Sequence, residues 1–327
     1  MVAAAALLHD IGHYPFSHAL EEIGVPHHEA VSRPLVTTGA LAGILRAEIG
    51  ANAAERIYDL ICGTSASPLQ GLISGSLDLD KMDYLKRDAL MCGVPYGEID
   101  EDRLMHAMVV VDDPATGRAC IGVRAKGLSA LESLLFAKYQ MYRNVYWHHA
   151  VRSATAMYKR LVEGALERGA IDAGALGGYT DEGLLHALET RGGDDERAML
   201  EALRTRRLYK RAFEAPAAEL PVESLEWIAE DRARTRAAER GLAKRLGLGE
   251  GDVLLDFPAK TQMLGLDLPV LEKDGGIRRL TQAGMAGSID LPKLSDALYR
   301  SARWLRVFTA KRVKIERAAL DEVFSGH

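Results

Sequence analysis

The stretch from His9 to His18 concentrates side chains that bind metals and transfer protons. It reads His-Asp-Ile-Gly-His-Tyr-Pro-Phe-Ser-His, so a tandem His-Asp pair and two further histidines surround a helix break. Imidazole nitrogens and carboxylate oxygens suit Mn, Fe, Co, Ni or Mg, and histidine exchanges protons near neutral pH. A single histidine is more often a satisfied core residue, but burying a whole polar cluster without a function is costly. Together with His27 and His28, the stretch therefore indicates a metal and phosphate site.

A second group of polar side chains follows on one predicted helix. Asp78 is a good N-cap, and helical periodicity runs from there to a stop at Gly93. Asp80, Tyr84 and Asp88 are spaced four residues apart, which places them on one helix face. Such a face suits a metal and a phosphorylated sugar. The alternative is an exposed amphipathic helix held by ion pairs.

His18 and Glu21 are candidates for proton transfer. Residues 16–23 are predicted to form a short helix after Pro15, and on it the two side chains lie three positions apart. The carboxylate can then orient the imidazole, which makes His18 a candidate general acid.

Composition sets the frame for these sites. The 327 residues are 48% hydrophobic and include only three cysteines, which favours a large core, a reducing compartment and a cytoplasmic location. The first residues carry no basic segment before the apolar run, so neither a signal peptide nor a membrane span is expected. A formal charge of -5 gives no general attraction to nucleic acid. The basic runs at 204–211 and 232–245 are interpreted as solvated helix faces or subunit contacts rather than polyanion sites.

The predicted elements are mostly helical. Apolar periodicity predicts helices over 3–11, from His28, over 53–62 and over 78–91, and a β-hairpin spans 108–123. Long helices are expected at 127–166, 181–192, 194–215 and 222–246, with β character at 253–279 and mixed structure at 293–323. The fold class is therefore mainly α, a helical bundle with a β-hairpin insertion and a smaller C-terminal α+β region. The expected division is a core over 1–170 and an extension over 171–327.

The spaced motifs resemble the HD-domain phosphohydrolases, specifically the deoxynucleoside triphosphate triphosphohydrolases related to the SAM-and-HD-domain enzyme. The likeness is carried by His9-Asp10-x-x-His13-x-Pro15-Phe16-Ser17-His18, by His28-Glu29, by Asp78-Leu79-Asp80-Lys81-x-Asp83-Tyr84-x-x-Arg87-Asp88 and by the block at 138–146. It implies an HD-domain helical bundle and a divalent metal. It also implies a dNTP substrate, cut at the α-phosphate into deoxynucleoside and triphosphate, and a homo-oligomer, either dimer or tetramer.

The resemblance also implies a role for each matching residue. Metal ligation would fall to His9, Asp10 and Asp80. His13 would contact the α-phosphate, His18 with Glu21 would protonate the departing 5′-oxygen, and His28 would assist. Substrate binding would involve Lys81 at phosphate, Tyr84 and Asp88 at the sugar, Tyr146 under the deoxyribose, and the less closely matching Lys138 and Tyr142.

One expected part of the family pattern is absent from this sequence. The family has a further metal-ligating histidine on a helix upstream of the His-Asp pair, and residues 1–8 contain none. The helix predicted over 3–11 also begins without an N-cap, which favours a truncated start over a natural variant with three protein ligands. Two other functions stay open: a degenerate HD module that binds nucleotide or metal as a regulatory subunit, and a phosphohydrolase acting on a nucleoside monophosphate or guanosine polyphosphate.

Overall fold

The computed structural model describes residues 1–259, 267–280 and 291–325. These residues form two compact units, and each unit draws on three stretches of the chain. The first contains Met1–Gly12, His28–Val145 and the described residues of 262–299. The second contains His13–His27 and the described residues of 146–261 and 300–327. The division at residue 170 was predicted for two continuous stretches of sequence, whereas each of these units combines three stretches. The division at residue 170 stays a prediction.

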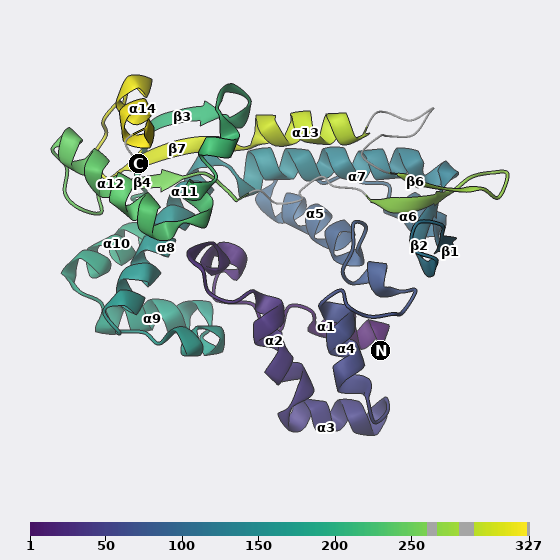
Figure 1. Cartoon of the computed structure of the whole chain (residues 1–327). Coiled ribbons are helices and arrows are strands. Elements are labelled where there is room, and N and C mark those ends of the chain that lie inside the picture. The colour runs from purple at the N-terminus through teal and green to yellow at the C-terminus, as the bar shows by residue number, and fades with distance from the viewer. Residues whose placement is uncertain (260–266, 281–290, 326–327) are drawn as a thin grey trace. The chain divides into compact units, whose positions relative to one another are not determined.

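The first unit begins with four short helices, α1 (Val2–Leu8), α2 (His28–Thr37), α3 (Gly39–Glu48) and α4 (Ala53–Ile61) (Figure 1). Helix α4 is strongly amphipathic, because its buried residues recur at the spacing of one helix face. The other three helices contribute smaller side chains to the same core. The buried members of this core are Ala5, Val36, Ala42, Leu45, Ala53, Ala54, Ile57, Leu60, Ile61 and Ile73.

Gly12 allows the chain that follows α1 to pass directly against α2. A Cβ atom at this position would lie 2.1 Å from the carbonyl oxygen of His28 and 2.6 Å from the amide nitrogen of Ser32. Both neighbours are helix backbone, so a larger residue would require the helix itself to move. The glycine of the His-Asp-Ile-Gly sequence is therefore required by packing, and it holds the preceding His-Asp pair close to α2.

Helices α5 (Leu79–Cys92), α6 (Glu101–Ala107) and α7 (Leu128–Met141) continue the first unit. The predicted ends of α5 are confirmed: the Asp78 carboxylate accepts a hydrogen bond from the Lys81 amide, and Gly93 takes a left-handed conformation with φ 66°. Met82, Leu85 and Ala89 form the buried face of α5. Asp80, Tyr84 and Asp88 follow one another at intervals of four residues, so they lie together on a different face of α5.

A four-stranded sheet completes the first unit. It contains β1 (Met108–Asp113), β2 (Arg118–Arg124), β5 (Leu268–Leu271) and β6 (Ile277–Leu280), in the order β1-β2-β5-β6. The predicted hairpin is confirmed as the antiparallel pair β1–β2, and β5 adds to it in parallel.

The second unit combines helices with a three-stranded antiparallel sheet. Its helices are η1 (Ser17–Ile23), α8 (His149–Glu167), α9 (Asp181–Arg191), α10 (Asp194–Arg204), α11 (Trp227–Glu230), α12 (Arg232–Leu246) and α14 (Arg317–Ser325). The sheet has β7 (Trp304–Thr309) between β3 (Lys210–Pro216) and β4 (Val253–Asp256). Helix α13 (Leu291–Ala302) precedes β7. The main core of this unit packs strand residues such as Leu255 and Val307 against Ala238 and Leu242 of α12.

The fold class predicted from sequence is confirmed, but three element predictions are wrong. The helix expected over 127–166 is interrupted, because residues Tyr142–Tyr146 form a π-helix (η4) and α8 begins only at His149. The helix expected over 194–215 ends at Arg204, and 210–216 is strand β3. The helix expected over 222–246 is broken, because α11 ends at Glu230 and α12 begins only at Arg232. The short helix expected over 16–23 is confirmed as the 3₁₀ helix η1, which starts at Ser17. The remaining short 3₁₀ turns of the described residues are η2 (Gln70–Leu72), η3 (Ala125–Gly127), η5 (Ala173–Gly178), η6 (Ala217–Glu219) and η7 (Val222–Ser224).

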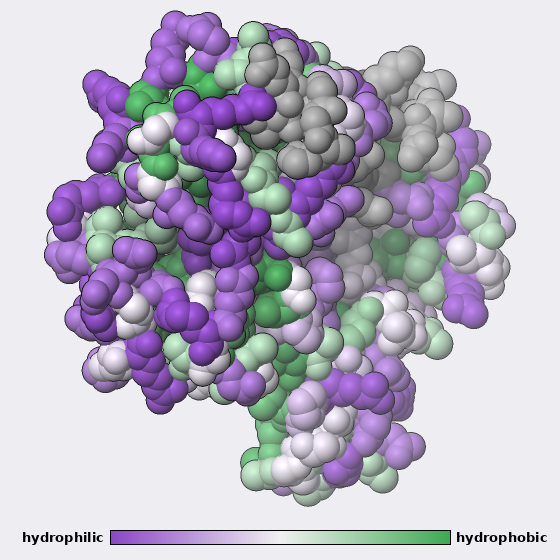
Figure 2. All heavy atoms as spheres, turned by 60° about the vertical axis from the view of Figure 1, so that its left-hand side comes forward, coloured by the Kyte–Doolittle hydropathy of each residue, from purple (hydrophilic) through white to green (hydrophobic). Residues whose placement is uncertain are grey.

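The face shown in Figure 2 is covered mostly by hydrophilic residues, with smaller apolar areas between them. Among the helices of the described residues, none combines the length and the hydropathy needed to cross a bilayer.

Candidate active site

His9, Asp10 and Asp80 come together in the first unit. Helix α1 ends at Leu8, so His9 and Asp10 lie directly after it, and Asp80 lies in the first turn of α5. The Nε2 atom of His9 lies 3.3 Å from Asp10 Oδ1 and 3.7 Å from Asp80 Oδ1. The structure thus places one imidazole nitrogen beside two carboxylates, and these are the three residues that the family resemblance implies as metal ligands.

The orientation of the His9 ring fits metal binding. Its Nδ1 atom lies 2.9 Å from the carbonyl oxygen of Ala6, to which an Nδ1–H group donates. The Nε2 atom is buried and has no hydrogen-bond partner among the described residues. A backbone hydrogen bond at one ring nitrogen commonly fixes the tautomer whose other nitrogen binds a metal. The orphaned nitrogen and its carboxylate neighbours therefore fit a divalent cation.

The electrostatics at His9 favour a positive charge. The Asp80 carboxylate is the largest influence, and it raises the pKa of His9 to about 9 against the lowering effect of burial. The Ala6 carbonyl and the Asp10 carboxylate act in the same direction as Asp80. A site that stabilises a proton in this way would also stabilise a metal cation at the same nitrogen.

The substrate residues predicted on α5 and α7 also come together in the first unit. Burial is the main cause that raises the pKa of the Tyr84 phenol, followed by the charges of Tyr142, Asp78, Asp80 and Asp88. Burial likewise raises the pKa of Tyr142. The charges of Tyr142, Asp80 and Asp88 all act on Tyr84, so these side chains lie near one another in the first unit.

Two lysines contribute positive charge to this unit. Lys81 donates to the carbonyl oxygen of Gly75 at 2.9 Å and forms a close ion pair with Asp78. Lys138 is only 8% exposed, and burial together with the charge of Lys81 lowers the pKa of Lys138 to about 8. A buried lysine next to another cation is a place where an anion would be stabilised.

His28 lies in the first turn of α2, also in the first unit. Its Nε2 atom is 3.7 Å from Glu29 Oε1, and its side chain is 13% exposed.

His13, His18 and Glu21 belong to the second unit. The Nδ1 atom of His18 lies 3.1 Å from Glu21 Oε2, and His27 Nδ1 lies 3.5 Å from the same oxygen. The His13 and His18 rings meet edge to face with centroids 4.5 Å apart, and His13 Nδ1 lies 3.1 Å from Ser17 Oγ. The structure thus pairs His18 with a carboxylate, as the spacing predicted.

The backbone just before His18 is strained. Phe16 and Ser17 have φ values of 60° and 61°, a left-handed conformation that costs about 1–3 kcal/mol for a residue other than glycine. Three contacts hold it: the Phe16 amide donates to Asp181 Oδ1 at 2.9 Å, the Tyr158 hydroxyl donates to the Pro15 carbonyl at 3.0 Å, and the Phe16 and Tyr158 rings meet edge to face. Strain of this kind is typical of functional sites.

Tyr146 is half-buried and ends the π-helix η4, on the second-unit side of the boundary between Val145 and Tyr146. The predicted site residues are therefore divided between the units, with His13, His18, Glu21 and Tyr146 in the second and the others in the first.

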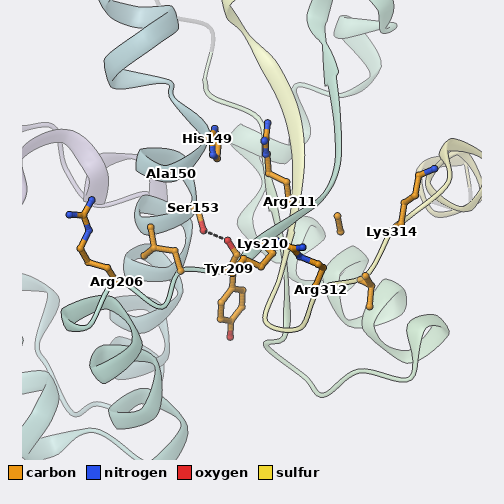
Figure 3. A pocket seen from close by; sticks show the side chains of 12 residues that line it. His149, Ala150, Ser153, Arg206, Tyr209, Lys210, Arg211, Arg312 and Lys314 are labelled. Atoms are coloured by element: carbon orange, nitrogen blue, oxygen red, sulfur yellow. Dashed lines mark hydrogen bonds between the residues drawn. The ribbon is translucent and has the colours of Figure 1, made fainter. Parts of the chain in front are cut away.

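A basic pocket in the second unit was not predicted from the sequence. It is a cavity of about 710 Å³ bordered by α8, by β3 and by the segments before β3 and after β7 (Figure 3). The run at 204–211 thus enters a turn and a strand, so its interpretation as a solvated helix face is wrong. No spacing links the contributing segments, which lie up to 165 positions apart between residues 149 and 314. The side chains that give the pocket its charge are Arg206, Lys210, Arg211, Arg312 and Lys314. Burial lowers the pKa of His149, which also borders the pocket.

Two family models match the chain. The one described as HD domain matches residues 1–88, and the one described as HD associated region matches residues 99–313. An uncharacterised protein of Methanocaldococcus jannaschii is 31% identical over 284 residues, which cover 86% of this chain and 58% of that protein.

Two further proteins extend the comparison. A Dictyostelium discoideum protein named as a deoxynucleoside triphosphate triphosphohydrolase SAMHD1 homolog is 27% identical over 178 residues, 48% of this chain and 32% of its own. A solved structure named as a phosphohydrolase from Bacteroides thetaiotaomicron has a TM-score of 0.65 at 20% identity, over 95% of this chain and 79% of its own, which shows a shared fold. The chain spans 58% and 32% of the lengths of the archaeal and Dictyostelium relatives.

Proposed function

Because the chain belongs to the HD-domain phosphohydrolases, we propose that it hydrolyses deoxynucleoside triphosphates at the α-phosphate and releases the deoxynucleoside with inorganic triphosphate. The observation that carries this proposal is the face of α5, on which the metal-ligating Asp80 is followed by Tyr84 and Asp88. The name of the Dictyostelium relative supports the same substrate class.

His9, Asp10 and Asp80 would hold the divalent metal on which HD domains generally depend. When bound, the metal would supply an activated water molecule near neutral pH and offset charge on the phosphate oxygens. The described residues would supply one imidazole nitrogen and two carboxylates to this metal. The hydrogen bond from His9 to Ala6 keeps the imidazole oriented for this role.

Lys81 and Lys138 would bind the phosphates. Burial, followed by the charge of Lys81, lowers the pKa of Lys138, and a polyphosphate close to both lysines would offset their repulsion. The Asp78 carboxylate and the Gly75 carbonyl keep the Lys81 ammonium in place before substrate arrives. Phosphate binding would therefore need little rearrangement of this side chain.

His18 would donate a proton to the 5′-oxygen of the departing deoxynucleoside, with Glu21 orienting its imidazole. His13 would contact the α-phosphate, and His28 would assist.

Asp88 would accept a hydrogen bond from the 3′-hydroxyl, with Tyr84 and Tyr142 beside the sugar. Tyr146 would pack under the deoxyribose, where a 2′-hydroxyl would clash. The proposed preference is therefore for deoxynucleotides over ribonucleotides.

Product analysis tests the proposal directly. Each of the four dNTPs and the four ribonucleoside triphosphates is incubated with the protein and Mg²⁺ or Mn²⁺. We expect deoxynucleoside and inorganic triphosphate in equal amounts from at least one dNTP, and little product from ribonucleotides. Release of orthophosphate or pyrophosphate would contradict cleavage at the α-phosphate, and binding without turnover would favour a regulatory module.

Lys138 predicts a specific pH dependence of substrate affinity. Because its pKa is lowered to about 8, Lys138 loses its charge as the pH rises through that value, whereas an exposed lysine stays charged to about pH 10. The KM for dNTP is therefore expected to rise above pH 8, by up to about tenfold per pH unit if the bound form requires the charge.

The Lys138→Arg variant is the control for this prediction. A guanidinium stays charged throughout the range, so its KM is expected to be flat between pH 7 and 9.5. If both proteins show the same rise in KM, Lys138 does not bind the phosphates.

A further inference from the structure

A network of four charged side chains is buried in the second unit. Arg152 of α8 donates from Nε and Nη2 to Asp256 of β4, with a shortest distance of 2.5 Å. The same guanidinium donates to both oxygens of Glu22 at 3.0 Å, and Lys159 Nζ donates to Glu22 Oε2 at 2.6 Å. The side chains of Arg152, Lys159 and Asp256 are at most 7% exposed.

The network is electrically balanced but costly to bury. It contains two carboxylates and two cations, and each loses the hydration of its charge when it is buried with its partners. Although burial acts to raise the pKa of Glu22, the charges of Arg152 and Lys159 hold it well below its usual range, so Glu22 is ionised. Apolar residues of similar volume generally stabilise a core at least as well as a buried ion network. Stability alone therefore gives no reason for these residue types.

Glu22, which the network binds, is next in sequence to the proposed proton-transfer pair of His18 and Glu21. Glu22 directly follows Glu21 in the 3₁₀ helix η1. Adjacent side chains on so short a helix point in different directions. The Glu21 carboxylate faces His18 and His27, while the Glu22 carboxylate faces Arg152 and Lys159. Holding Glu22 thus fixes the rotation of η1, and with it the direction of Glu21.

The start of the segment that carries His18 and Glu21 is held by contacts that do not involve Glu22. Tyr158 binds the Pro15 carbonyl, and Asp181 binds the Phe16 amide ahead of the strained residues Phe16 and Ser17. These contacts lie before His18. Beyond it, Leu20 is fully buried and the Tyr14 hydroxyl donates to the Pro26 carbonyl at 2.8 Å. The Glu22 network adds charged contacts at the end of η1 that carries Glu21.

We propose that Arg152, Lys159 and Asp256 are positioning residues for His18 and Glu21, acting through Glu22. Asp256 orients the Arg152 guanidinium, Arg152 and Lys159 clamp Glu22, and the clamped η1 presents Glu21 to the His18 imidazole. The catalytic part of this inference rests on the proposed function, because it takes His18 as the proton donor. The positioning part concerns the protein alone.

The Glu22→Gln variant tests the positioning part by hydrogen exchange. Glutamine keeps the size of the side chain but loses the charge that attracts Arg152 and Lys159. Amides of 17–27 are expected to exchange at least tenfold faster than in the unmodified protein, while those of α8 are unchanged. Equal exchange of 17–27 in the two proteins would overturn the proposal, whatever the activity.

Glu163→Gln is the matched control. Glu163 lies on α8, as Arg152 and Lys159 do, and is buried. It accepts from Arg232 at 2.6 and 3.0 Å and lies 3.6 Å from Arg160, and both partners are outside the His13–His27 segment. This variant breaks a comparable ion pair on the same helix and is expected to leave the exchange of 17–27 unchanged. If it accelerates that exchange as much as Glu22→Gln, the effect is general destabilisation and the proposal fails.

Two substrates separate positioning of a proton donor from a structural role. A dNTP must expel a 5′-alkoxide, which needs a proton, whereas bis(p-nitrophenyl) phosphate expels a phenolate that needs none. Glu22→Gln is expected to lower kcat on dNTP by 30- to 100-fold and on the aryl ester by less than threefold. An equal loss on both substrates would overturn the proposal.

The positioning role and the proposed function can each be contradicted without the other. If the unmodified protein releases no triphosphate from any dNTP, the proposed function fails, and the exchange experiment still decides the positioning role. If Glu22→Gln does not fold, Lys159→Gln carries the same test, since it leaves both salt bridges of Arg152 in place. Faster exchange confined to 17–27 in that variant supports the proposal, and unchanged exchange overturns it.

Discussion

Asp80→Asn is expected to lower dNTP turnover by at least about 10³-fold, which corresponds to about 4 kcal/mol of lost transition-state stabilisation. The Asp80 carboxylate is the largest influence favouring positive charge at His9, and it lies 3.7 Å from the orphaned His9 Nε2. An asparagine has the same size but no charge, so the metal would lose its strongest electrostatic partner. The measurement is kcat at saturating Mn²⁺, together with the metal content of the purified protein.

Asp83→Asn is the matched control for that change. Asp83 is on the same helix and pairs with Arg87 on the exposed surface, where its side chain is 64% exposed. Surface ion pairs contribute little, so turnover and metal content are expected to stay within about twofold of the unmodified protein. If Asp80→Asn retains its metal and its turnover, Asp80 is not a ligand.

His18→Ala is expected to lower kcat on dNTP by about 10²–10⁴-fold, the usual contribution of a positioned general acid. His18 is not among the proposed ligands, so the metal content is expected to be unchanged. Turnover of bis(p-nitrophenyl) phosphate should fall far less, because the phenolate leaves without a proton. The measurement is the ratio of the two kcat values in the variant and the unmodified protein.

His27→Ala is the control for His18. His27 approaches the same Glu21 oxygen at 3.5 Å, but its side chain is 78% exposed and it has no proposed role in proton transfer. We expect its effect on both substrates to be less than about threefold, as for other surface substitutions. Full activity of His18→Ala on dNTP, with the metal still bound, would remove the general-acid role.

Sequence features within a few residues of each other predicted helix α5, which carries Asp80, Tyr84 and Asp88, and the hairpin β1–β2. Asp78 and Gly93 specify the ends of α5 through hydrogen bonding and backbone conformation that depend on a few neighbouring residues. The apolar runs at 109–111 and 119–123, with the turn between them, specified the hairpin in the same way. The pairing of His18 with Glu21 also came from spacing alone.

The elements that were missed depend on distant partners. Residues 210–216 continue a helical composition, but they pair with β7 nearly a hundred positions away, and the left-handed Arg206 redirects the chain before them. The interruption at Tyr142–Tyr146 lies within a stretch predicted as one continuous helix, and its residue types give no sign of a π-helix. Tertiary context overrides local preference in both places.

The Glu22 network could not be predicted from the sequence, because its members also lie far apart in the chain. Arg152 and Asp256 lie 130 and 234 positions from Glu22, so no spacing rule connects them. From the sequence, Glu22 is one of two adjacent acids on a short helix. Only the folded second unit distinguishes the acid that faces His18 from the acid that is clamped.

The strand order of the second unit bears on how the chain is made. Strand β7 lies between β3 and β4 but follows β4 by 48 residues, from Asp256 to Trp304. At about 5–20 residues per second, a ribosome needs roughly 2–10 s for that interval. Throughout it, β3 and β4 exist without the strand that joins them, and Leu254 and Leu255 lack Val307 and Phe308 as partners. The nascent chain therefore presents unpaired apolar strand edges for seconds, which makes chaperone contact most valuable between the synthesis of β4 and that of β7.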